Sequence, residues 1–501
     1  MVRVSYYKFT DAVKYPVNPP FDPGRAYPEL NHLYQSDVPI QSGNVVYDCV
    51  RNLLATLGLD KERFDTPNWN PFGDLVGEGQ SVLIKPNLVL HTHLKKQGVF
   101  WIVSHPAVMR AMADYALLAV GPQGRVTIGD TPLENCDFDN LIDAIGLRAM
   151  VHALMDRGFS NLELLDFRTF QTTQYPDGSI EKQALSGDPR GYTEINLARH
   201  SLLQELEDRS GEQNYYTLGD HTVDHLNPKT RQRGLSNRYH SSGRHVYRIP
   251  NTVLDANLVI DIAKLKTHKF SGVTLCLKNA IGICQGKEFL PHRRPGTLTE
   301  GGDSFPHLPS ATYVRNLRLK RSLFSLLGGK NVAVIRSWIR RVIPAKLPHE
   351  IHTEPLYGDW YGNDTIWRTT LDLNLVLFHA TRDGLDLSRP QRTFFGLIDG
   401  IIGMDHEAPM TGLPVYSRLL IAARDPLAAD LLATYLMGFD PRNVPTITGA
   451  MAPQCRFLGD IVLCRKEIVG NHPLSESRSM FVPTKGWMGR LENPELEWPF
   501  N

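Results

Sequence analysis

Short apolar stretches of strand length alternate along the chain with stretches of helical periodicity. Helical spacing is clear in Ser42–Asp60, where Val46, Cys49, Leu53 and Leu57 share one face. The strand-length runs are Ser81–Leu90, Arg125–Pro132, Leu162–Phe167, Asn257–Lys266, Thr393–Ile401 and Ser417–Asp425, and further helices are expected at Ser104–Val120, Asp139–Gly158 and Pro426–Gly438. Strands that are apolar throughout are typical of parallel sheets buried on both faces. The pattern therefore predicts an α/β fold, with a mainly parallel sheet and helices on both faces.

The same pattern divides the chain into segments. Residues 1–41 form an N-terminal arm, 42–303 the first part of the α/β domain, 304–350 a basic helical insert, and 351–501 the second part of the domain with a C-terminal tail. Within the first part, residues 171–243 are polar and rich in turn signals, and they are expected to form an excursion from the domain.

The insert has no acidic residue between Asp303 and Glu350 and contains two basic amphipathic stretches separated by Gly328-Gly329. Such helices can lie on a membrane surface or bind an acidic protein partner. The alternative is a helical lid whose cations are solvated or paired with acids elsewhere in the chain. Both interpretations stay open at the level of sequence.

Composition limits the classes of function. Of the 501 residues, 42% are apolar and 21% charged, and the net charge is +1 with a pI of about 7.7. A nearly neutral chain is not drawn as a whole to nucleic acid, so no nucleic-acid partner is expected and any electrostatic role is local. No secretory signal and no apolar run of about 20 residues is evident, so a soluble, cytoplasmic protein is expected, peripheral at a membrane if the insert binds one. The six cysteines include no C-x-x-C pair, so no iron–sulfur cluster is expected.

Polar side chains follow the predicted strands at the point where each strand ends. They are Lys85, Asn87, Asp130, Lys264, Lys266, His268, Asp399 and Asp425. Ligands of open α/β sheets bind beyond the carboxyl ends of the strands, so these side chains are expected to meet in one cleft. Lys264, Lys266 and His268 alternate along an extended chain and should share a side. A structural network of ion pairs with Asp261, Asp399 or Asp425 is the alternative, because buried lysine needs a partner.

This cluster indicates an anion-binding site. His268, Lys266 and Lys264 are the predicted catalytic residues, with His268 as general acid and base because its ordinary pKa lies near neutrality. Lys85, Asn87, Asp130, Lys278 and Asn279 are predicted to bind the substrate. Asp399, Asp405 and Asp425 are candidate ligands of a divalent metal, or they orient the lysines.

Several of these stretches resemble a known family. The motifs are "VLIKPNLV", "SHPAVMRAMADY", "IGDTP", "LVIDIAKLKTHKFSGVTLCLKNAIGI", "GLIDGIIGM" and "DPLAADLLATYLMGFDP". Their order across Val82–Pro441 is similar to that in the family known as domain of unknown function 362. Leu290–Asp303 and Tyr361–Asn374 resemble a long-form subgroup, which adds His292, Arg293 and Arg368 to the predicted substrate-binding residues. Many members carry a ferredoxin-like iron–sulfur module, but this chain lacks the C-x-x-C-x-x-C run that such a module requires.

Two classes of function follow. The first is an enzyme of unassigned reaction that acts on a small anionic substrate bearing phosphate or carboxylate. The alternative is a non-catalytic ligand-binding or assembly protein, and the settings of some relatives suggest polysaccharide biosynthesis. A small anionic ligand is expected in both cases.

Overall fold

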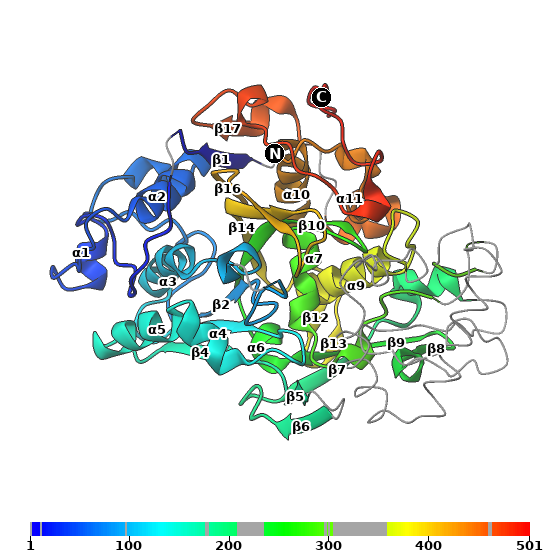
Figure 1. Ribbon diagram of the computed structural model, residues 1–501. Helices are drawn as coiled ribbons and strands as arrows, with labels where there is room; N and C mark the ends of the chain where they lie inside the picture. The colour runs from blue at the N-terminus through cyan, green and yellow to red at the C-terminus, as the bar shows by residue number, and fades with distance from the viewer. Residues whose placement is uncertain are drawn as a thin grey trace, which may run out of the picture.

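One large mixed sheet forms the centre of the protein (Figure 1). The computed structural model describes residues 3–10, 13–95, 98–175, 180–207, 235–294, 298, 301–303, 358–458 and 463–500. The strand order is β17-β1-β16-β14-β10-β2-β3-β4, and β11 and β15 pair with the ends of β10 and β14. The strands are β1 (Val4–Lys8), β2 (Ser81–Pro86), β3 (Arg125–Asp130), β4 (Leu162–Asp166), β10 (Leu258–His268), β11 (Gly272–Thr274), β14 (Thr393–Asp405), β15 (Leu413–Val415), β16 (Leu419–Ala423) and β17 (Ile468–Gly470).

Strand direction determines which residues meet at each edge of the sheet. The strands β4, β3, β2, β10 and β14 are mutually parallel, whereas β16 is antiparallel to both β14 and β1. The carboxyl ends of the five parallel strands therefore lie along one edge. The carboxyl end of β16 lies at the opposite edge, because its Ala423 pairs with Gly396 near the start of β14.

Helices cover both faces of the sheet (Figure 1). One face is covered by α2 (Val45–Leu57), α3 (Pro106–Val120) and α5 (Leu147–Asp156), and the other by α7 (Cys276–Asn279), α9 (Ile366–His379), α10 (Pro426–Leu436) and α11 (Pro445–Ala450). A hydrophobic core lies on each face of the sheet, and residues of β10 contribute to both. Ile260 and Ile262 pack on the α2–α3 side, and Ala263 and Leu265 pack on the α9–α10 side. A strand buried on both faces is mostly apolar, which is why the sequence shows apolar runs at these strands. The predicted α/β class is confirmed.

One predicted helix is in fact two. The stretch Asp139–Gly158 was expected to be continuous, but it forms α4 (Phe138–Ala144) and α5, separated at Ile145 and Gly146. Gly146 adopts φ 77°, a left-handed conformation that ends a helix and that glycine adopts without strain.

The first strand belongs to the central sheet, because β1 lies between β16 and β17. The polar stretch at 171–243 contributes to two small sheets (Figure 1). One pairs β5 with β6, and in the other β9 lies between β7 and β8. Their bounds are β5 (Phe170–Gln174), β6 (Ile180–Ala184), β7 (Tyr192–Asn196), β8 (His240–Ser241) and β9 (Arg244–Pro250). The basic insert at 304–350 lies outside the described residues, and the division of the chain into segments stays a prediction.

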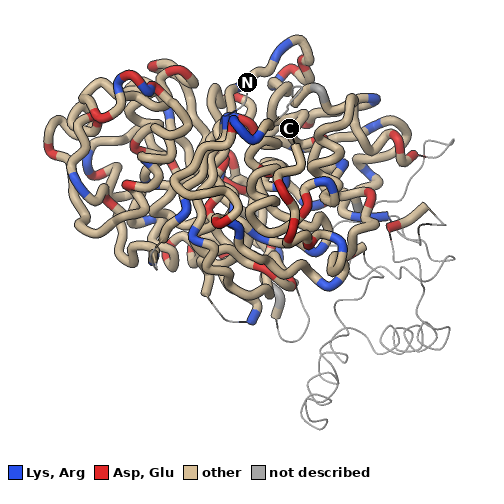
Figure 2. Tube along the Cα trace, turned by 90° about the horizontal axis from the view of Figure 1, so that it is seen from above, with Lys and Arg blue, Asp and Glu red and all other residues tan. Residues whose placement is uncertain are grey.

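Lysine and arginine are interspersed with aspartate and glutamate along the described chain (Figure 2). No helix within the described ranges is long and apolar enough to cross a membrane.

Candidate functional site

The site is built where β10 continues past the end of β2 at the carboxyl edge of the sheet. Its last residues, Lys266–His268, pair with β11 in a tight hairpin, and Lys266 lies opposite Thr274. After β11 the chain turns into α7 and carries Lys278 and Asn279 back to the end of β2. The polar residues that follow the apolar strand therefore belong to a hairpin and a helical turn, which fold back over the end of β2.

Asn279 joins the strand ends around this point. Its Oδ1 accepts hydrogen bonds from Lys85 Nζ at 3.2 Å and from Asn87 Nδ2 at 2.9 Å. Its Nδ2 donates to Asp261 Oδ1 and to the Lys85 carbonyl. Burial raises the pKa of Asp261 to about 7. One amide thus fixes β2, β10 and α7 relative to one another.

Lys85 and Asp130 form a buried ion pair across β2 and β3. The distance from Lys85 Nζ to Asp130 Oδ1 is 2.8 Å, and Lys85 is 2% exposed. Asp130 also accepts from the backbone N–H of Leu88 and Thr131. Gly282 lies directly against the pair, since an added Cβ would stand 2.3 Å from Asp130 Oδ1. Only glycine allows this close approach.

Lys266 is buried without a carboxylate. Its Nζ donates to Asn87 Oδ1 at 2.6 Å and to the Ile102 carbonyl at 2.8 Å, and the residue is 0% exposed. Among the described residues it forms no salt bridge. Burial, together with the charges of Lys264 and Lys278, holds its pKa well below the ordinary lysine value. An anion is the ligand that would stabilise the charged form of this amine.

A cavity of about 100 Å³ lies between these elements. The charged and titratable side chains that line it are Lys85, Asp130, Lys266, His268, Lys278, Lys287 and His292. Among the described lining residues Asp130 is the one carboxylate, and it is already paired with Lys85. Burial and neighbouring lysines lower the pKa of Lys278 to about 7, and no described residue forms a hydrogen bond or a salt bridge with its amine. The cavity therefore has an excess of amines over carboxylates.

His268 presents a hydrogen-bond donor to the cavity. Its Nδ1 accepts from the backbone N–H of Phe270 at 3.2 Å and of Ser271 at 3.3 Å. Burial and the charge of Lys278 hold the pKa of His268 well below its ordinary value, so the ring is neutral near pH 7. A neutral ring whose Nδ1 is an acceptor carries its proton on Nε2.

His292 has the opposite tautomer. Its Nδ1 donates to the Leu290 carbonyl at 2.7 Å, which leaves Nε2 without a proton in the neutral ring. Burial and Lys278 again hold the pKa well below the ordinary value. The cavity therefore contains one imidazole that can donate through Nε2 and one that can accept a proton there.

Lys264 lies outside this cavity, although it shares a strand with Lys266. Its Nζ is 3.0 Å from Asp399 Oδ2 and 3.0 Å from the Tyr15 hydroxyl. Asp399 also accepts from Tyr15 and from the backbone N–H of His105, whose ring stacks on Tyr15 at 4.0 Å. The register of β10 on β14 shifts between Lys264 and Lys266, so that Lys264 faces Asp399 and Lys266 faces Met404. The three residues predicted to share one site are thus divided: Lys264 forms an ion pair, whereas Lys266 and His268 line the cavity.

The predicted arginines are not brought to the cavity. Arg368 pairs with Glu205 at 2.5 Å and with Asp364 at 3.3 Å, and its guanidinium stacks on Trp367. Arg293 is 6% exposed and is not among the residues that line the cavity. Arg368 is thus held by ion pairs in the first turn of α9.

The three candidate metal ligands lie apart. Asp399 is held by Lys264 and Tyr15, and Asp405 accepts from His406 Nδ1 at 2.6 Å and from the Val482 N–H. Asp425 follows β16, so the antiparallel direction of that strand places it at the opposite edge, where it caps α10 by accepting from the Ala428 N–H. Nor does any group of three histidine, cysteine, aspartate or glutamate side chains suited to a metal occur among the described residues. The expectation that these carboxylates act together is therefore not met.

Sequence reasoning missed Lys287, which lines the cavity and is 9% exposed. Burial lowers its pKa, and Glu134 partly opposes that shift. The available signal was its position between Lys278 and His292, both of which were predicted. Tyr15 was also missed, because nothing in the N-terminal sequence indicates that its hydroxyl reaches Asp399.

Fold and site together define an α/β protein with a lysine-lined cavity at the carboxyl edge of its sheet. The model of the family described as "domain of unknown function (DUF362)" matches residues 216–435. This match supports the resemblance that the motifs predicted. The matched span includes Lys266, Lys278 and His292, whereas Lys85 and Asp130 precede it.

Two further comparisons were made. None of the curated proteins matches the chain. A crystal structure of a protein from Thermotoga maritima, determined by a structural genomics consortium, matches with a TM-score of 0.28 and 10% sequence identity. The match covers 74% of this chain and 53% of the other, so the chain spans about half the length of that protein.

Proposed function

We propose that this protein is an enzyme that acts on a small anionic substrate bearing a phosphate or a carboxylate. The observation that carries the proposal is the excess of buried amines over carboxylates in the cavity. A lysine that is buried without an acidic partner is unfavourable unless a ligand supplies the opposite charge. A volume of about 100 Å³ suits one small anionic group, and it is well below the roughly 300–1,000 Å³ of pockets that enclose a drug-sized molecule.

The groups in the cavity divide into two roles. Lys266, Lys278 and Lys287 supply charge to the anion, and the Nε2–H of His268 donates a hydrogen bond to it. His292 is the general base, because its unprotonated Nε2 is kept free by the bond from Nδ1 to Leu290. This assignment moves the proton-transfer role from His268, where the sequence placed it, to His292.

Lys278 is suited to a second proton-transfer role. Its pKa of about 7 means that it gains and loses a proton near neutral pH. When an anion binds, the added negative charge favours the protonated form. Binding of the substrate would then prepare Lys278 as a general acid.

Two narrower statements belong to this proposal. The reaction takes place in the cytoplasm. A membrane or acidic protein partner would bind through residues 304–350, which lie outside the described residues.

The enzyme hypothesis can be tested without knowing the substrate. The purified protein is incubated with a mixture of phosphorylated and carboxylated metabolites, and mass spectrometry follows which compounds are consumed and which copurify with the chain. We expect the unaltered protein to consume at least one anionic compound, and His292→Gln to bind that compound without consuming it. An anionic compound that is bound but never consumed would instead identify a ligand-binding or assembly protein.

A further inference from the structure

A second, larger cavity lies at the opposite edge of the sheet. It has a volume of about 720 Å³, within the range of metabolite-sized pockets. Its walls come from the end of α9, residues 387–392 that follow the hairpin of β12 (Ala380–Thr381) and β13 (Gly384–Leu385), the start of β14, and the Pro453–Leu458 turn. The lysine-lined cavity uses none of these residues, so the two cavities are separate.

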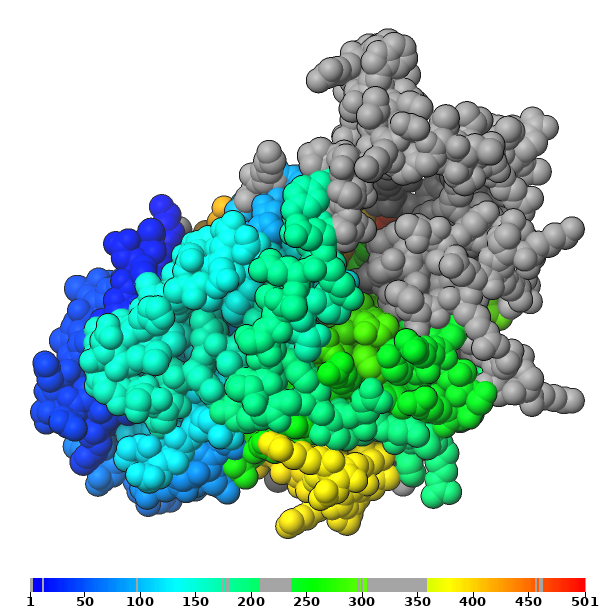
Figure 3. All heavy atoms as spheres, turned by 90° about the horizontal axis from the view of Figure 1, so that it is seen from below, coloured from blue at the N-terminus to red at the C-terminus, as the bar shows by residue number. Residues whose placement is uncertain are grey.

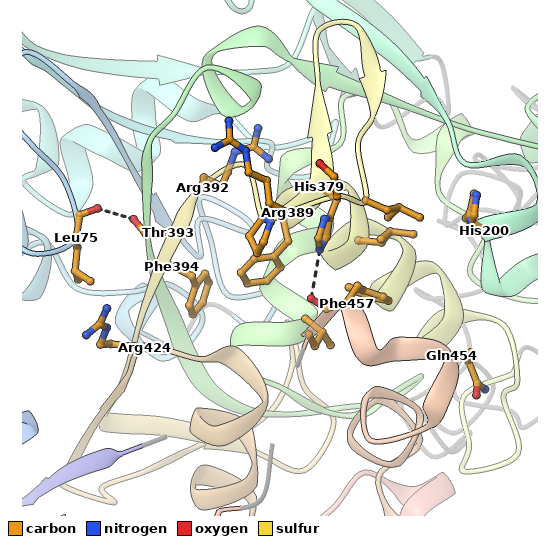
Figure 4. Close-up of a pocket in the computed structure, with 16 residues that line it drawn as sticks. Leu75, His200, His379, Arg389, Arg392, Thr393, Phe394, Arg424, Gln454 and Phe457 are labelled. Carbon is orange, nitrogen blue, oxygen red and sulfur yellow. Dashed lines mark hydrogen bonds between the residues drawn. The ribbon is translucent and has the colours of Figure 1, made fainter. Parts of the chain in front are cut away.

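The inner wall of this cavity is aromatic. Phe378 and Phe394 lie with ring centroids 5.7 Å apart, and Phe457 meets the ring of His379 edge-on at 6.2 Å. In Figure 4 Phe394 and Phe457 lie between Arg424 at one end and Gln454 at the other. Such a wall offers flat apolar surface to an aromatic or long aliphatic group.

Arginine supplies the polar part of the lining. Arg392 is 5% exposed, and its guanidinium donates to the carbonyls of Leu254 and Ala380 at 2.7 Å and to carbonyls at the end of α9. Arg389 and Arg424 are exposed at the rim. Within the described part of the chain, none of the three forms a salt bridge, and no aspartate or glutamate lines the cavity.

The charge of Arg392 persists at neutral pH. Burial lowers its pKa to about 10, which still leaves the guanidinium protonated. Its Nε is buried, and no acceptor among the described residues forms a hydrogen bond with it. The wall is therefore positive behind the aromatic rings and positive again at the rim.

We propose that this cavity binds an organic anion with an aromatic or aliphatic body, whose acidic group pairs with Arg389 or Arg424 while its body lies on Phe394 and Phe457. A second ligand site at the amino edge of the sheet is independent of the lysine-lined cavity. The yellow segment that includes the β12–β13 hairpin lies at the surface of the protein in Figure 3, and residues 387–390, which follow the hairpin, line the cavity.

The probe for this site is 8-anilinonaphthalene-1-sulfonate, a fluorescent aromatic anion, and the comparison is N-phenyl-1-naphthylamine, which lacks the sulfonate. Fluorescence titration of the whole chain should give one bound sulfonate dye per chain. In the double variant Arg389→Gln/Arg424→Gln we expect the dissociation constant of the sulfonate dye to rise about tenfold, as for loss of a charge-assisted hydrogen bond. The neutral dye should keep its affinity.

Two control variants locate the dye. Arg382→Gln removes an exposed arginine of the same hairpin that pairs with Asp255 and does not line the cavity. Lys278→Met alters the other cavity. Neither should change the affinity for the sulfonate dye. The proposal is overturned if the dye does not bind, if the double rim variant leaves its affinity unchanged, or if either control variant weakens it as much.

Discussion

The amine of Lys266 donates a 2.6 Å hydrogen bond to the neutral amide oxygen of Asn87, and the side chain is fully buried. Two residues earlier on the same strand, Lys264 is held 3.0 Å from the carboxylate of Asp399. The same side chain therefore has opposite roles at neighbouring positions. Lys264 completes a buried ion pair, whereas Lys266 has no acidic partner among the described residues, so a bound anion would stabilise its charged form.

Lys266→Met should separate affinity from stability. The substitution leaves the acceptors of Asn87 and Ile102 unpaired, which costs about 1–3 kcal/mol, but it also removes repulsion from Lys264 and Lys278. We expect the affinity for sulfate to fall at least tenfold, with the melting temperature changed by only a few degrees. Calorimetric titration and thermal unfolding measure the two effects, and unchanged sulfate affinity would remove Lys266 from the site.

Lys264→Met should lower the stability of the protein and leave its affinity for sulfate nearly unchanged. It leaves Asp399 as a buried charge without its partner, which costs on the order of 3–5 kcal/mol. The melting temperature should fall by about 1 °C for each kcal/mol in a chain of this length, while sulfate affinity in the folded protein stays within about threefold. Lys264→Met/Asp399→Asn should recover much of the stability. If Lys264→Met alone abolishes sulfate binding and leaves stability intact, Lys264 is a ligand of the anion.

Lys278 makes both stability and binding depend on pH. Its folded pKa of about 7 lies below the ordinary 10.5, so the folded state binds fewer protons than the unfolded state between these values. Its contribution to stability therefore increases as pH rises from about 7 to 10.5 and is lowest below 7. Lys278→Met should raise the melting temperature more at pH 6.5 than at pH 10.

The same lysine predicts the direction in which sulfate affinity changes. Sulfate carries a constant charge in this range, and its affinity for the unaltered protein should increase as pH falls from 9 to 6.5 while Lys278 gains a proton. Titration calorimetry at several pH values measures this slope. A slope that persists in Lys278→Met would assign the proton to another group.

Asp425 provides a test of strand direction. Burial raises its pKa to about 7 from 3.8, so the stability that it contributes is present at low pH and is lost as pH rises through that range. Asp425→Asn keeps an acceptor for the Ala428 N–H and removes the buried charge. We expect stability at pH 8 to increase by about 2 kcal/mol with sulfate affinity unchanged. Weaker sulfate binding in this variant would contradict its place at the opposite edge.

The sheet could be predicted from the sequence because strands buried on both faces correspond to apolar runs of strand length. The parallel strands β2, β3, β10 and β14 all lie within predicted runs or extend them. The direction of β16 could not be predicted, because an apolar run has the same composition whichever way it points. This single reversal moved Asp425 away from the other strand ends.

Most residues of the site were predicted, but Lys287 was not, and neither was the separation of Lys264 from the cavity. Lys85, Asn87, Asp130, Lys266, Lys278 and Asn279 do meet, since they follow the ends of parallel strands or the hairpin after them. The separation of Lys264 from Lys266 depends on a register shift and on Tyr15, which is distant in the sequence. The tautomers of His268 and His292 depend on backbone contacts that no sequence pattern encodes.

The central claim, that the lysine-lined cavity binds an anion, is tested most directly by anomalous diffraction from crystals soaked in selenate, a tetrahedral oxyanion like sulfate. The account predicts a selenium peak between Lys266, Lys278 and the Nε2 of His268, which disappears in crystals of Lys266→Met. A selenate ion bound elsewhere on the protein, with no peak in this cavity, would contradict it.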